Sequence, residues 1–315
     1  MQDNASTVPE KALSAQENAL ASRIGRIGVW HGGLGREPAA TARQAAAEIE
    51  RLGYGALWFG EGPATKEAFS HAALLLAATD RLTVATGIAN IWGRDAAAAN
   101  GAAHTLAEAY DGRFVLGLGA SHAPIVNLRG HTYAKPLAAM RAYLDAMDRA
   151  PYEGPVTDPA PPRVLAALGP KMLELARDRA AGAHPYFVPT EHTAPAREIL
   201  GNGPLLAPEQ AVLLETDPSK ARALAREHHT RFYLELPNYV GNLRRFGFDD
   251  DDFTGGGSDR LVDAIVAWGD VDAVRRRVRD HLAAGADHVA IQPLAPHRGL
   301  GLDQLRELAP ALLAD

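Results

Sequence analysis

From Ile24 to the C-terminus, short apolar runs alternate with segments that carry apolar residues at helical spacing. A strand that is apolar on both faces has to be covered on both faces, so this alternation indicates a parallel sheet enclosed by helices. Eight strands are expected, at residues 26–30, 56–59, 82–86, 113–119, 164–168, 184–188, 211–214 and 288–292. Eight repeats fit a single closed (β/α)8 TIM barrel better than an open doubly wound sheet, and no GxGxxG motif follows the first strand.

Glycine marks three of the joins between a helix and the next strand. Gly53, Gly182 and Gly285 each follow the end of an expected helix by one or two residues. Because glycine adopts the left-handed conformation freely, we expect all three to occupy the position that ends a helix. Each chain segment then enters its strand within a few residues, as the short connections of a repeated α/β unit require.

One long segment, at about residues 217–268, interrupts the repeat after the seventh strand. It contains a helix that begins near Pro218, an aromatic run at 232–239 and an acidic stretch at 249–252. In a barrel, an insertion at this point follows the carboxyl end of a strand and lies over the active-site mouth. We therefore expect a helical insertion that serves as a lid, with a packing elaboration as the alternative. Residues 1–23 are expected to form a polar tail without function, and residues 24–315 a single barrel domain.

Composition excludes several classes of protein. The chain has no cysteine, which excludes a disulfide scaffold, a thiolate nucleophile and zinc or iron–sulfur sites held by thiolates. A formal net charge of −6 argues against a nucleic-acid or anionic-membrane partner. No run of 18 apolar residues is present, and the first twenty residues lack the basic and apolar regions of a secretory signal. We expect a cytoplasmic protein.

Barrel enzymes carry their chemistry at the carboxyl ends of the strands. Three ionisable residues follow expected strands there, namely His31 after the first, Glu61 after the second and His122 after the fourth. They would converge on one substrate, or each would be an ordinary structural hydrogen-bonding group. Glycines cluster at the same strand ends, and backbone without side chains admits a flat ligand closely. No metal site is expected, because the adjacent His228 and His229 point apart on a helix and no His-x-His ends the first strand.

The turn after the fifth strand has the features of an anion site. Gly169-Pro170-Lys171 puts a proline in the first turn of a helix and leaves backbone N–H groups free there. The helix dipole and these N–H groups favour a phosphate, although an ordinary helix start has the same sequence pattern.

Several segments resemble one enzyme family. Residues 111–119, Asp-Gly-Arg-Phe-Val-Leu-Gly-Leu-Gly, resemble the fourth-strand signature of the bacterial luciferase-like superfamily of flavin- or deazaflavin-dependent monooxygenases and reductases, and residues 53–61, 86–88 and 285–289 fit the same family. Residues 121–122, 131–136, 237–239 and 256–263 resemble its actinobacterial subgroup of coenzyme F420-dependent oxidoreductases. The resemblance covers roughly Ile24 to the C-terminus.

The resemblance implies a TIM barrel that holds an isoalloxazine-like ring in its mouth. Residues 86–88 would form a bulge after the third strand, where relatives often have a non-proline cis peptide beside the ring. His122 would lie where some deazaflavin dehydrogenases carry an acidic proton donor, and histidine is a departure that still transfers protons. The candidate catalytic residues are His122, Glu61 and His31, of which His122 and Glu61 match positions of the family and His31 is a candidate from its place after the first strand. The implied cofactor-binding residues are Glu61, Thr86, Gly87, Ile88, Ser121, His122, Leu168, Gly169, Pro170, Lys171 and Met172.

The cofactor decides which chemistry is expected. A deazaflavin carries hydride at C5 and does not readily activate oxygen, whereas reduced FMN does, so the protein contributes binding and orientation. We expect an oxidoreductase that transfers hydride between coenzyme F420 and an unidentified small organic substrate, with His122 exchanging the accompanying proton. The alternatives are an FMN-dependent luciferase-like monooxygenase and a non-catalytic flavin- or deazaflavin-binding protein. A homodimer is expected.

Overall fold

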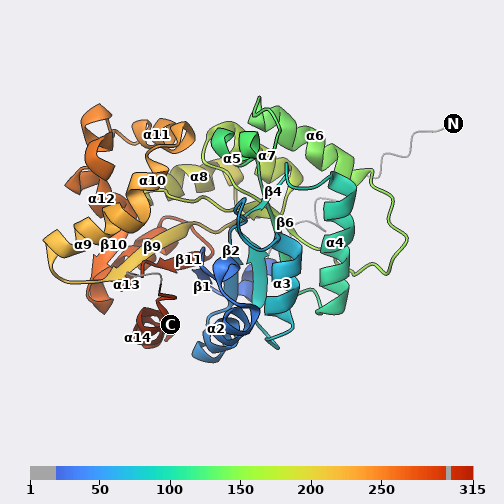
Figure 1. The fold of residues 1–315 in the computed structure, drawn as a ribbon, viewed down its shortest axis with the longest axis horizontal. Coiled ribbons are helices and arrows are strands. Elements are labelled where there is room, and N and C mark those ends of the chain that lie inside the picture. The colour runs from blue at the N-terminus through green and yellow to red at the C-terminus, as the bar shows by residue number, and fades with distance from the viewer. Residues whose placement is uncertain (1–18, 296–298, 315) are drawn as a thin grey trace.

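The computed structural model describes residues 19–295 and 299–314 and shows a parallel sheet that curls around a central axis (Figure 1). The strands follow the order β10-β9-β11-β1-β2-β3-β5-β6-β7-β8, and β4 lies beside β5. Their bounds are β1 Ile27–Trp30, β2 Ala56–Phe59, β3 Thr83–Thr86, β4 Ala89–Asn90, β5 Phe114–Gly119, β6 Arg163–Leu165, β7 Gly182–Ala183, β8 Leu205–Leu206, β9 Glu209–Leu214, β10 Val266–Gly269 and β11 Val289–Pro293.

A bend in one strand closes the sheet. β8 pairs with β7, while β9 pairs with β11, and only Ala207 and Pro208 separate β8 from β9. The bend itself is held by backbone hydrogen bonds, because the N–H of Ala207 donates to the carbonyl of Ala183 at 3.0 Å and Pro208 accepts from Ala290 at 3.0 Å. Counting β8 and β9 as one bent strand, the closed ring of the described sheet has eight strands, and β10 and β4 pair with β9 and β5 in addition to it. The expectation of a TIM barrel is confirmed, and the open doubly wound sheet is excluded.

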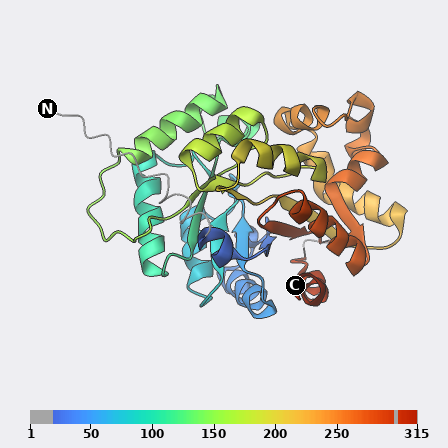
Figure 2. The ribbon, with the colours of Figure 1, turned by 180° about the vertical axis from the view of Figure 1, so that it is seen from behind.

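Helices cover the outer face of the barrel, as Figures 1 and 2 show from opposite sides. The apolar residues of each strand are shared between two layers, because neighbouring side chains point to opposite faces. Trp30 and Trp58 belong to the interior cluster, while Val29 and Leu57 pack under the helices. The bounds are α2 Ala39–Leu52, α3 Ala68–Leu76, α4 Ala96–Ala109, α5 Ala123–Leu128, α6 Pro136–Asp148, α7 Pro170–Arg179, α8 Thr193–Leu200, α13 Val271–Ala283 and α14 Leu302–Leu312, with short 3₁₀ helices η1 Leu34–Arg36 and η2 Thr190–His192.

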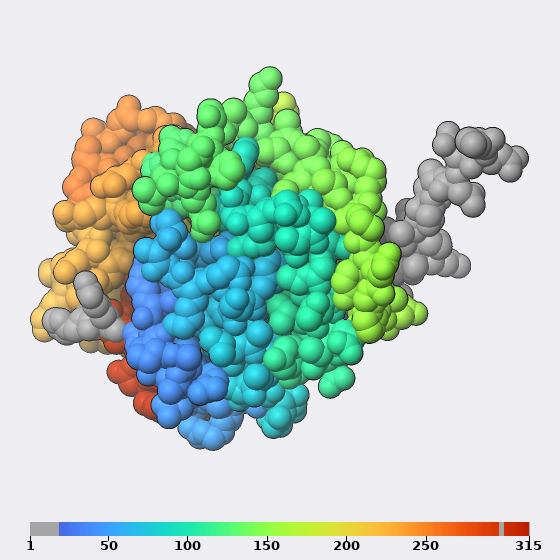
Figure 3. Space-filling view, turned by 45° about the vertical axis from the view of Figure 1, so that its right-hand side comes forward, coloured from blue at the N-terminus to red at the C-terminus, as the bar shows by residue number. Residues whose placement is uncertain are grey.

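A helical lobe follows β9 and precedes β10. Figure 3 shows its gold and orange surface packed beside the blue N-terminal part of the barrel. Its elements are α9 Pro218–Ala225, the π-helix η3 Arg226–Thr230, α10 Arg231–Tyr233, α11 Pro237–Arg244, the 3₁₀ segment η4 Asp250–Gly256 and α12 Asp259–Ile265. We call residues 215–265 the lobe. β10 pairs with β9 in parallel, and its first three residues lie inside the segment 217–268 that was expected to be helical.

The prediction of a strand at His184–Val188 is wrong. The strand at this place is β7, which stops at Ala183, and residues 184–188 have no regular structure. Pro185 has no N–H to give to a sheet, and Phe187 has a φ of 56°, which breaks an extended chain. The N–H of Phe187 donates to the carboxylate of Glu209 at 3.1 Å and so is satisfied without a neighbouring strand.

Two of the three expected left-handed glycines are found. Gly53 and Gly285 have φ angles of 96° and 103°. The expectation is wrong for Gly182, which lies in β7 and is glycine for another reason. A Cβ on Gly182 would be 2.2 Å from the carbonyl oxygen of Leu205, so the two strands pair here only because that position has no side chain.

The first 18 residues of the expected tail lie outside the described residues, and the division of the chain into tail, barrel and insertion stays a prediction. Residues 19–24 are helical, and Leu20 and Ile24 are buried in the core cluster that fills the barrel. Among the described helices, none has the length and apolar character needed to cross a bilayer.

Gly117 in β5 lies where this strand closely approaches β3. A Cβ there would lie 1.7 Å from the carbonyl oxygen of Thr86, whereas Gly241 in α11 has nothing within 4 Å of such a Cβ. We expect Gly117→Ala to lower the free energy of unfolding by ~1–3 kcal/mol or more. Gly241→Ala should raise it by up to ~1 kcal/mol. Urea unfolding followed by circular dichroism measures both, and equal stabilities for the two variants would contradict the proposed contact.

Candidate active site

The bulge after β3 brings together several residues that the sequence singled out. Thr86 is buried and its hydroxyl donates to the carbonyl of Gly117 at 2.7 Å. The peptide bond between Gly87 and Ile88 is cis, as the resemblance implied. Gly119, at the end of β5, leaves room for Ile88, because a Cβ on Gly119 would be 2.4 Å from the Ile88 side chain. The ends of β3 and β5 therefore form one contiguous backbone surface.

Three glycines at the strand ends lie around the indole ring of Trp30. Trp30 is the last residue of β1, and its indole lies within 3.3 Å of where a Cβ would project from Gly32, Gly60 or Gly87. The indole N–H donates to the carbonyl of Gly87 at 3.1 Å. Part of the flat space that these glycines provide is thus filled by Trp30, which fixes the bulge from the interior of the barrel.

Glu61 is enclosed by positive charge. Its side chain is 2% exposed and forms an ion pair with Arg94, and a guanidinium nitrogen of Arg129 lies 3.9 Å from the same oxygen. The other carboxylate oxygen accepts from the N–H of Asn90 at 2.9 Å. The Glu61 N–H donates to the carbonyl of Ile88 at 3.2 Å. With both oxygens engaged, Glu61 holds the segment that follows the bulge.

His31 is also engaged through both ring nitrogens. Its Nδ1 accepts from the N–H of Gly33 at 3.0 Å, so Nε2 carries the proton and donates to the carbonyl of Leu300 at 2.8 Å. Burial lowers the pKa of His31. This neutral imidazole joins the loop after β1 to the segment after β11, and it contacts neither Glu61 nor His122 through a hydrogen bond.

His122 joins the barrel to the lobe. It is the residue before α5 and is half-buried, and its Nδ1 lies 3.1 Å from the side-chain oxygen of Asn238 in α11. Its ring centroid is 5.4 Å from that of Tyr239. Burial lowers the pKa of His122, and the bond to Asn238 opposes that shift. Ser121, just before it, has a φ of 60° that turns the chain at the end of β5.

The turn after β6 presents the features of an anion site. Gly169 precedes α7, no side chain caps the helix, and Pro170 is its first residue. A residue that the sequence did not single out lies beside it, because a Cβ on Gly169 would be 3.1 Å from a guanidinium nitrogen of Arg245. Arg245 follows α11 in the lobe and donates to the carbonyl of Leu168 at 2.7 Å. A helix N-terminus and a guanidinium group thus face the same space, which suits a phosphate.

Aromatic side chains fill the contact between the barrel and the lobe. Tyr186 has its ring centroid 4.9 Å from Trp30 and 5.0 Å from Tyr233 of α10. Phe187 packs at 5.2 Å from His229 and at 5.3 Å from Tyr239. We call Trp30, Tyr186, Phe187, His229, Tyr233 and Tyr239 the aromatic cluster. The sequence showed an aromatic run at 232–239, but it did not reveal which strand ends these rings would contact.

Glu209 and Gln292, which the sequence did not single out, lie beside these rings. Gln292 on β11 accepts from the hydroxyl of Tyr186 at 2.8 Å, and Tyr186 also lies at 2.8 Å from the hydroxyl of Tyr233. Glu209 is 2% exposed on β9. It lies two residues before the strand expected at 211–214, so no signal in the sequence marked it as a buried acid.

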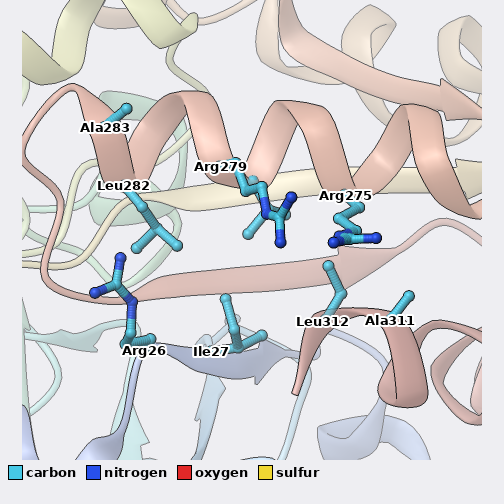
Figure 4. Close-up of a pocket in the computed structure, with 9 residues that line it drawn as sticks. Arg26, Ile27, Arg275, Arg279, Leu282, Ala283, Ala311 and Leu312 are labelled. Carbon is cyan, nitrogen blue, oxygen red and sulfur yellow. The ribbon is translucent and has the colours of Figure 1, made fainter. Parts of the chain in front are cut away.

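A separate hollow of about 320 Å³ lies at the opposite end of the barrel. Arg26 and Ile27 at the start of β1 form one wall, so this hollow is at the amino ends of the strands, where barrel enzymes do not carry their chemistry. Figure 4 shows that helices α13 and α14 complete it, and its lining residues are Arg26, Ile27, Arg275, Val278, Arg279, Leu282, Ala283, Ala311 and Leu312. None of the expected site residues belongs to it.

Comparison with known proteins finds one matching family model and relatives that align over most of this chain. Residues 23–288 match the family model of luciferase-like monooxygenases. The chain is 25% identical to a 5,10-methylenetetrahydromethanopterin reductase of Methanolobus tindarius, over 79% of this chain and 89% of that one. It is also 25% identical to a Mycobacterium tuberculosis protein described as a coenzyme F420-dependent oxidoreductase, over 84% of this chain and 94% of that one.

Among solved structures, the coenzyme F420-dependent tetrahydromethanopterin reductase from Methanopyrus kandleri has the same fold. The two superpose with a TM-score of 0.74 at 18% identity, covering 91% of this chain and all of that one. These relatives are oxidoreductases, and the family match spans most of the barrel. The chain therefore belongs to the luciferase-like monooxygenase family of enzymes.

Proposed function

We propose that this enzyme transfers hydride between coenzyme F420 and a small organic substrate at the carboxyl end of its barrel. The observation that carries the proposal is the convergence of an uncapped helix N-terminus, the backbone of Gly169 and the Arg245 guanidinium on one space after β6. That space fits the phosphate of a flavin-like cofactor. Two of the relatives described above are named for coenzyme F420, which favours it over FMN.

The residues present fit the deazaflavin on chemical grounds. The backbone of residues 86–88 and Ser121 would support its ring, and Leu168–Met172 with Arg245 would bind its phosphate. When bound, the deazaflavin supplies a hydride at C5. The chain itself contributes binding, orientation and the exclusion of water by the lobe.

His122 is the best candidate for the group that exchanges the accompanying proton. Its Nδ1 is held by Asn238, while Nε2 has no hydrogen bond in the described part of the chain. Because burial lowers its pKa, the imidazole is neutral near pH 7 and accepts a proton from a substrate hydroxyl. Glu61 and His31, with all their polar atoms engaged inside the protein, act as positioning residues in this proposal.

The assembly and location of the enzyme stay predictions. We expect a homodimer, which light scattering of the purified protein tests, and a cytoplasmic location.

The phosphate site makes distinct predictions for three neighbouring residues. Gly169→Val should weaken F420 binding by about tenfold or more, because its side chain displaces Arg245 and blocks approach to the helix. Arg245→Gln should weaken binding by a similar factor, whereas Lys171→Ala should change it by less than about threefold, since the backbone and not the lysine side chain binds the anion. Quenching of F420 fluorescence gives the dissociation constants, and parallel titrations with FMN identify the preferred cofactor.

Retained melting temperature in each variant is the control for folding. A Gly169→Val protein that is folded and binds F420 as tightly as the wild type would contradict the phosphate site. Tighter binding of FMN than of F420 would instead favour the monooxygenase alternative on the same fold. Tight binding of either cofactor without turnover of any tested compound would favour a non-catalytic binding protein.

His122→Ala should separate binding from chemistry. We expect cofactor affinity to be nearly retained and the single-turnover rate with any compound that the wild type reduces or oxidises to fall by ~10²–10⁴-fold. If His122 only connects the loop to α11, the variant and Asn238→Ala should lose the same melting temperature while the folded fraction reacts normally. Unchanged hydride transfer in a folded, cofactor-saturated variant would remove His122 from the mechanism.

A further inference from the structure

Glu209 is a buried acid with one free oxygen. Its residue is 2% exposed, one carboxylate oxygen accepts from the N–H of Phe187 at 3.1 Å, and the other oxygen has no hydrogen-bond partner among the described residues. A buried polar atom without a partner is uncommon in folded proteins and points to a missing ligand or water. The proposed hydride transfer does not use Glu209.

Three tyrosines from separate segments of the chain face Glu209. Tyr186 precedes Phe187 in the segment after β7, Tyr233 lies in α10 and Tyr239 in α11, and all three interact electrostatically with Glu209. His229 of η3 packs on Phe187 and Tyr233 at 5.2 and 5.1 Å, and its Nε2 also lacks a hydrogen-bond partner among the described residues. No cation is among the groups that shift the pKa of Glu209, although Arg36 acts on Tyr233.

These surroundings decide the charge of Glu209. Burial raises its pKa to about 8, although the hydrogen bond from Phe187 opposes the shift. Burial raises the pKa of Tyr233 to about 12 and lowers that of His229 to about 3, so both are uncharged across the neutral range. Glu209 therefore retains its proton at neutral pH. That proton belongs on the oxygen not occupied by the Phe187 N–H, which makes the free oxygen a hydrogen-bond donor without an acceptor.

The side chains that interact with Glu209 are the flat rings of Tyr186, Tyr233 and Tyr239, and these rings pack on one another and on Trp30. Trp30 and Tyr186 approach with ring centroids at 4.9 Å, and Tyr186 and Tyr239 lie at 6.3 Å. Rings of this kind pack against other rings and provide no charge to compensate an ion. An anionic ligand would have to lose its hydration with no cation to replace it, whereas an uncharged ligand would not.

We propose that Glu209, in its uncharged form, anchors a substrate subsite for a neutral ring compound that carries a hydrogen-bond acceptor. The proposal rests on the proposed function only in taking the carboxyl end of the barrel as the substrate site. Glu209 donates a hydrogen bond to the acceptor, and the aromatic cluster packs on the ring. The subsite excludes carboxylates and other anions of the same shape.

Benzamide and benzoate test this subsite, because they share a shape and differ in charge. At pH 6.5 we expect benzamide to bind the wild-type enzyme at least about tenfold more tightly than benzoate, as measured by titration calorimetry. Glu209→Leu should bind benzamide about tenfold more weakly. Glu209→Gln keeps an N–H donor and should bind it within about threefold of wild type. Glu235→Gln, the same change at an exposed position of the lobe, is the matched control and should have no effect.

The pH dependence of binding adds a second readout. At pH 9.5, above the pKa of Glu209, benzamide should bind the wild type about tenfold or more weakly than at pH 6.5, because the ionised carboxylate no longer donates. Binding to Glu209→Gln should change little between the two pH values. Benzoate binding as tight as benzamide binding, no benzamide binding to the folded wild type, or no loss in Glu209→Leu would each overturn the proposal.

Melting temperatures report on Glu209 without any ligand. Its pKa is higher in the folded protein, at about 8, than the 4.5 of a free glutamate side chain. The stability that this proton contributes is therefore fully present below pH 4.5 and is lost as the pH rises through 8. Compared with Glu209→Gln, the wild type should lose several degrees of melting temperature between pH 5 and pH 9. An unchanged difference between the two proteins would contradict an uncharged Glu209.

The test of the Glu209 subsite does not depend on whether the protein binds F420. If the protein binds no F420 but binds benzamide through Glu209, the proposed function fails and the subsite stands. If it binds F420 while benzamide affinity is unaffected by Glu209→Leu, the subsite fails and the proposed function stands.

Discussion

The closure of the sheet through the bend between β8 and β9 is the constraint on which the site depends. Parallel strands have to satisfy their backbone groups on both sides, and here the chain does so by pairing β8 with β7 and β9 with β11. Because all the strands of the barrel are parallel, closure brings the carboxyl end of every strand to the same end of the barrel. The same bend places Glu209 in the interior, directly after Pro208, with its N–H bonded to the carbonyl of Pro185 at 2.9 Å. An open sheet would have left these strand ends in a row.

The second constraint is the close backbone approach that glycine permits. Gly117 and Gly119 let the bulge after β3 lie against β5, and Gly182 lets β7 lie against β8. Trp30 donates to the carbonyl of Gly87 within the bulge, and Glu61, paired with Arg94, accepts from the N–H of Asn90 after it. Rigid support of this kind suits a site that must present backbone to a flat cofactor.

The lobe completes the site instead of only covering it. Arg245 supplies the cation beside α7, Asn238 holds His122, and Tyr233 bonds to Tyr186. Three separate points of the mouth therefore depend on one insertion.

The sequence by itself determined the barrel, most strand positions and the candidate phosphate turn, because apolar periodicity and proline at a helix start are local signals. It did not determine that His184–Val188 is irregular, since the bond from Phe187 to Glu209 depends on a residue 22 positions away in the chain. Nor did it determine that His31 and Glu61 are fully engaged within the protein, or that Arg245 lies beside Gly169. Those outcomes depend on which side chains meet across the mouth. Only the tertiary structure decided them, because hydrogen-bond partners and burial are set by distances in space and not by spacing along the chain.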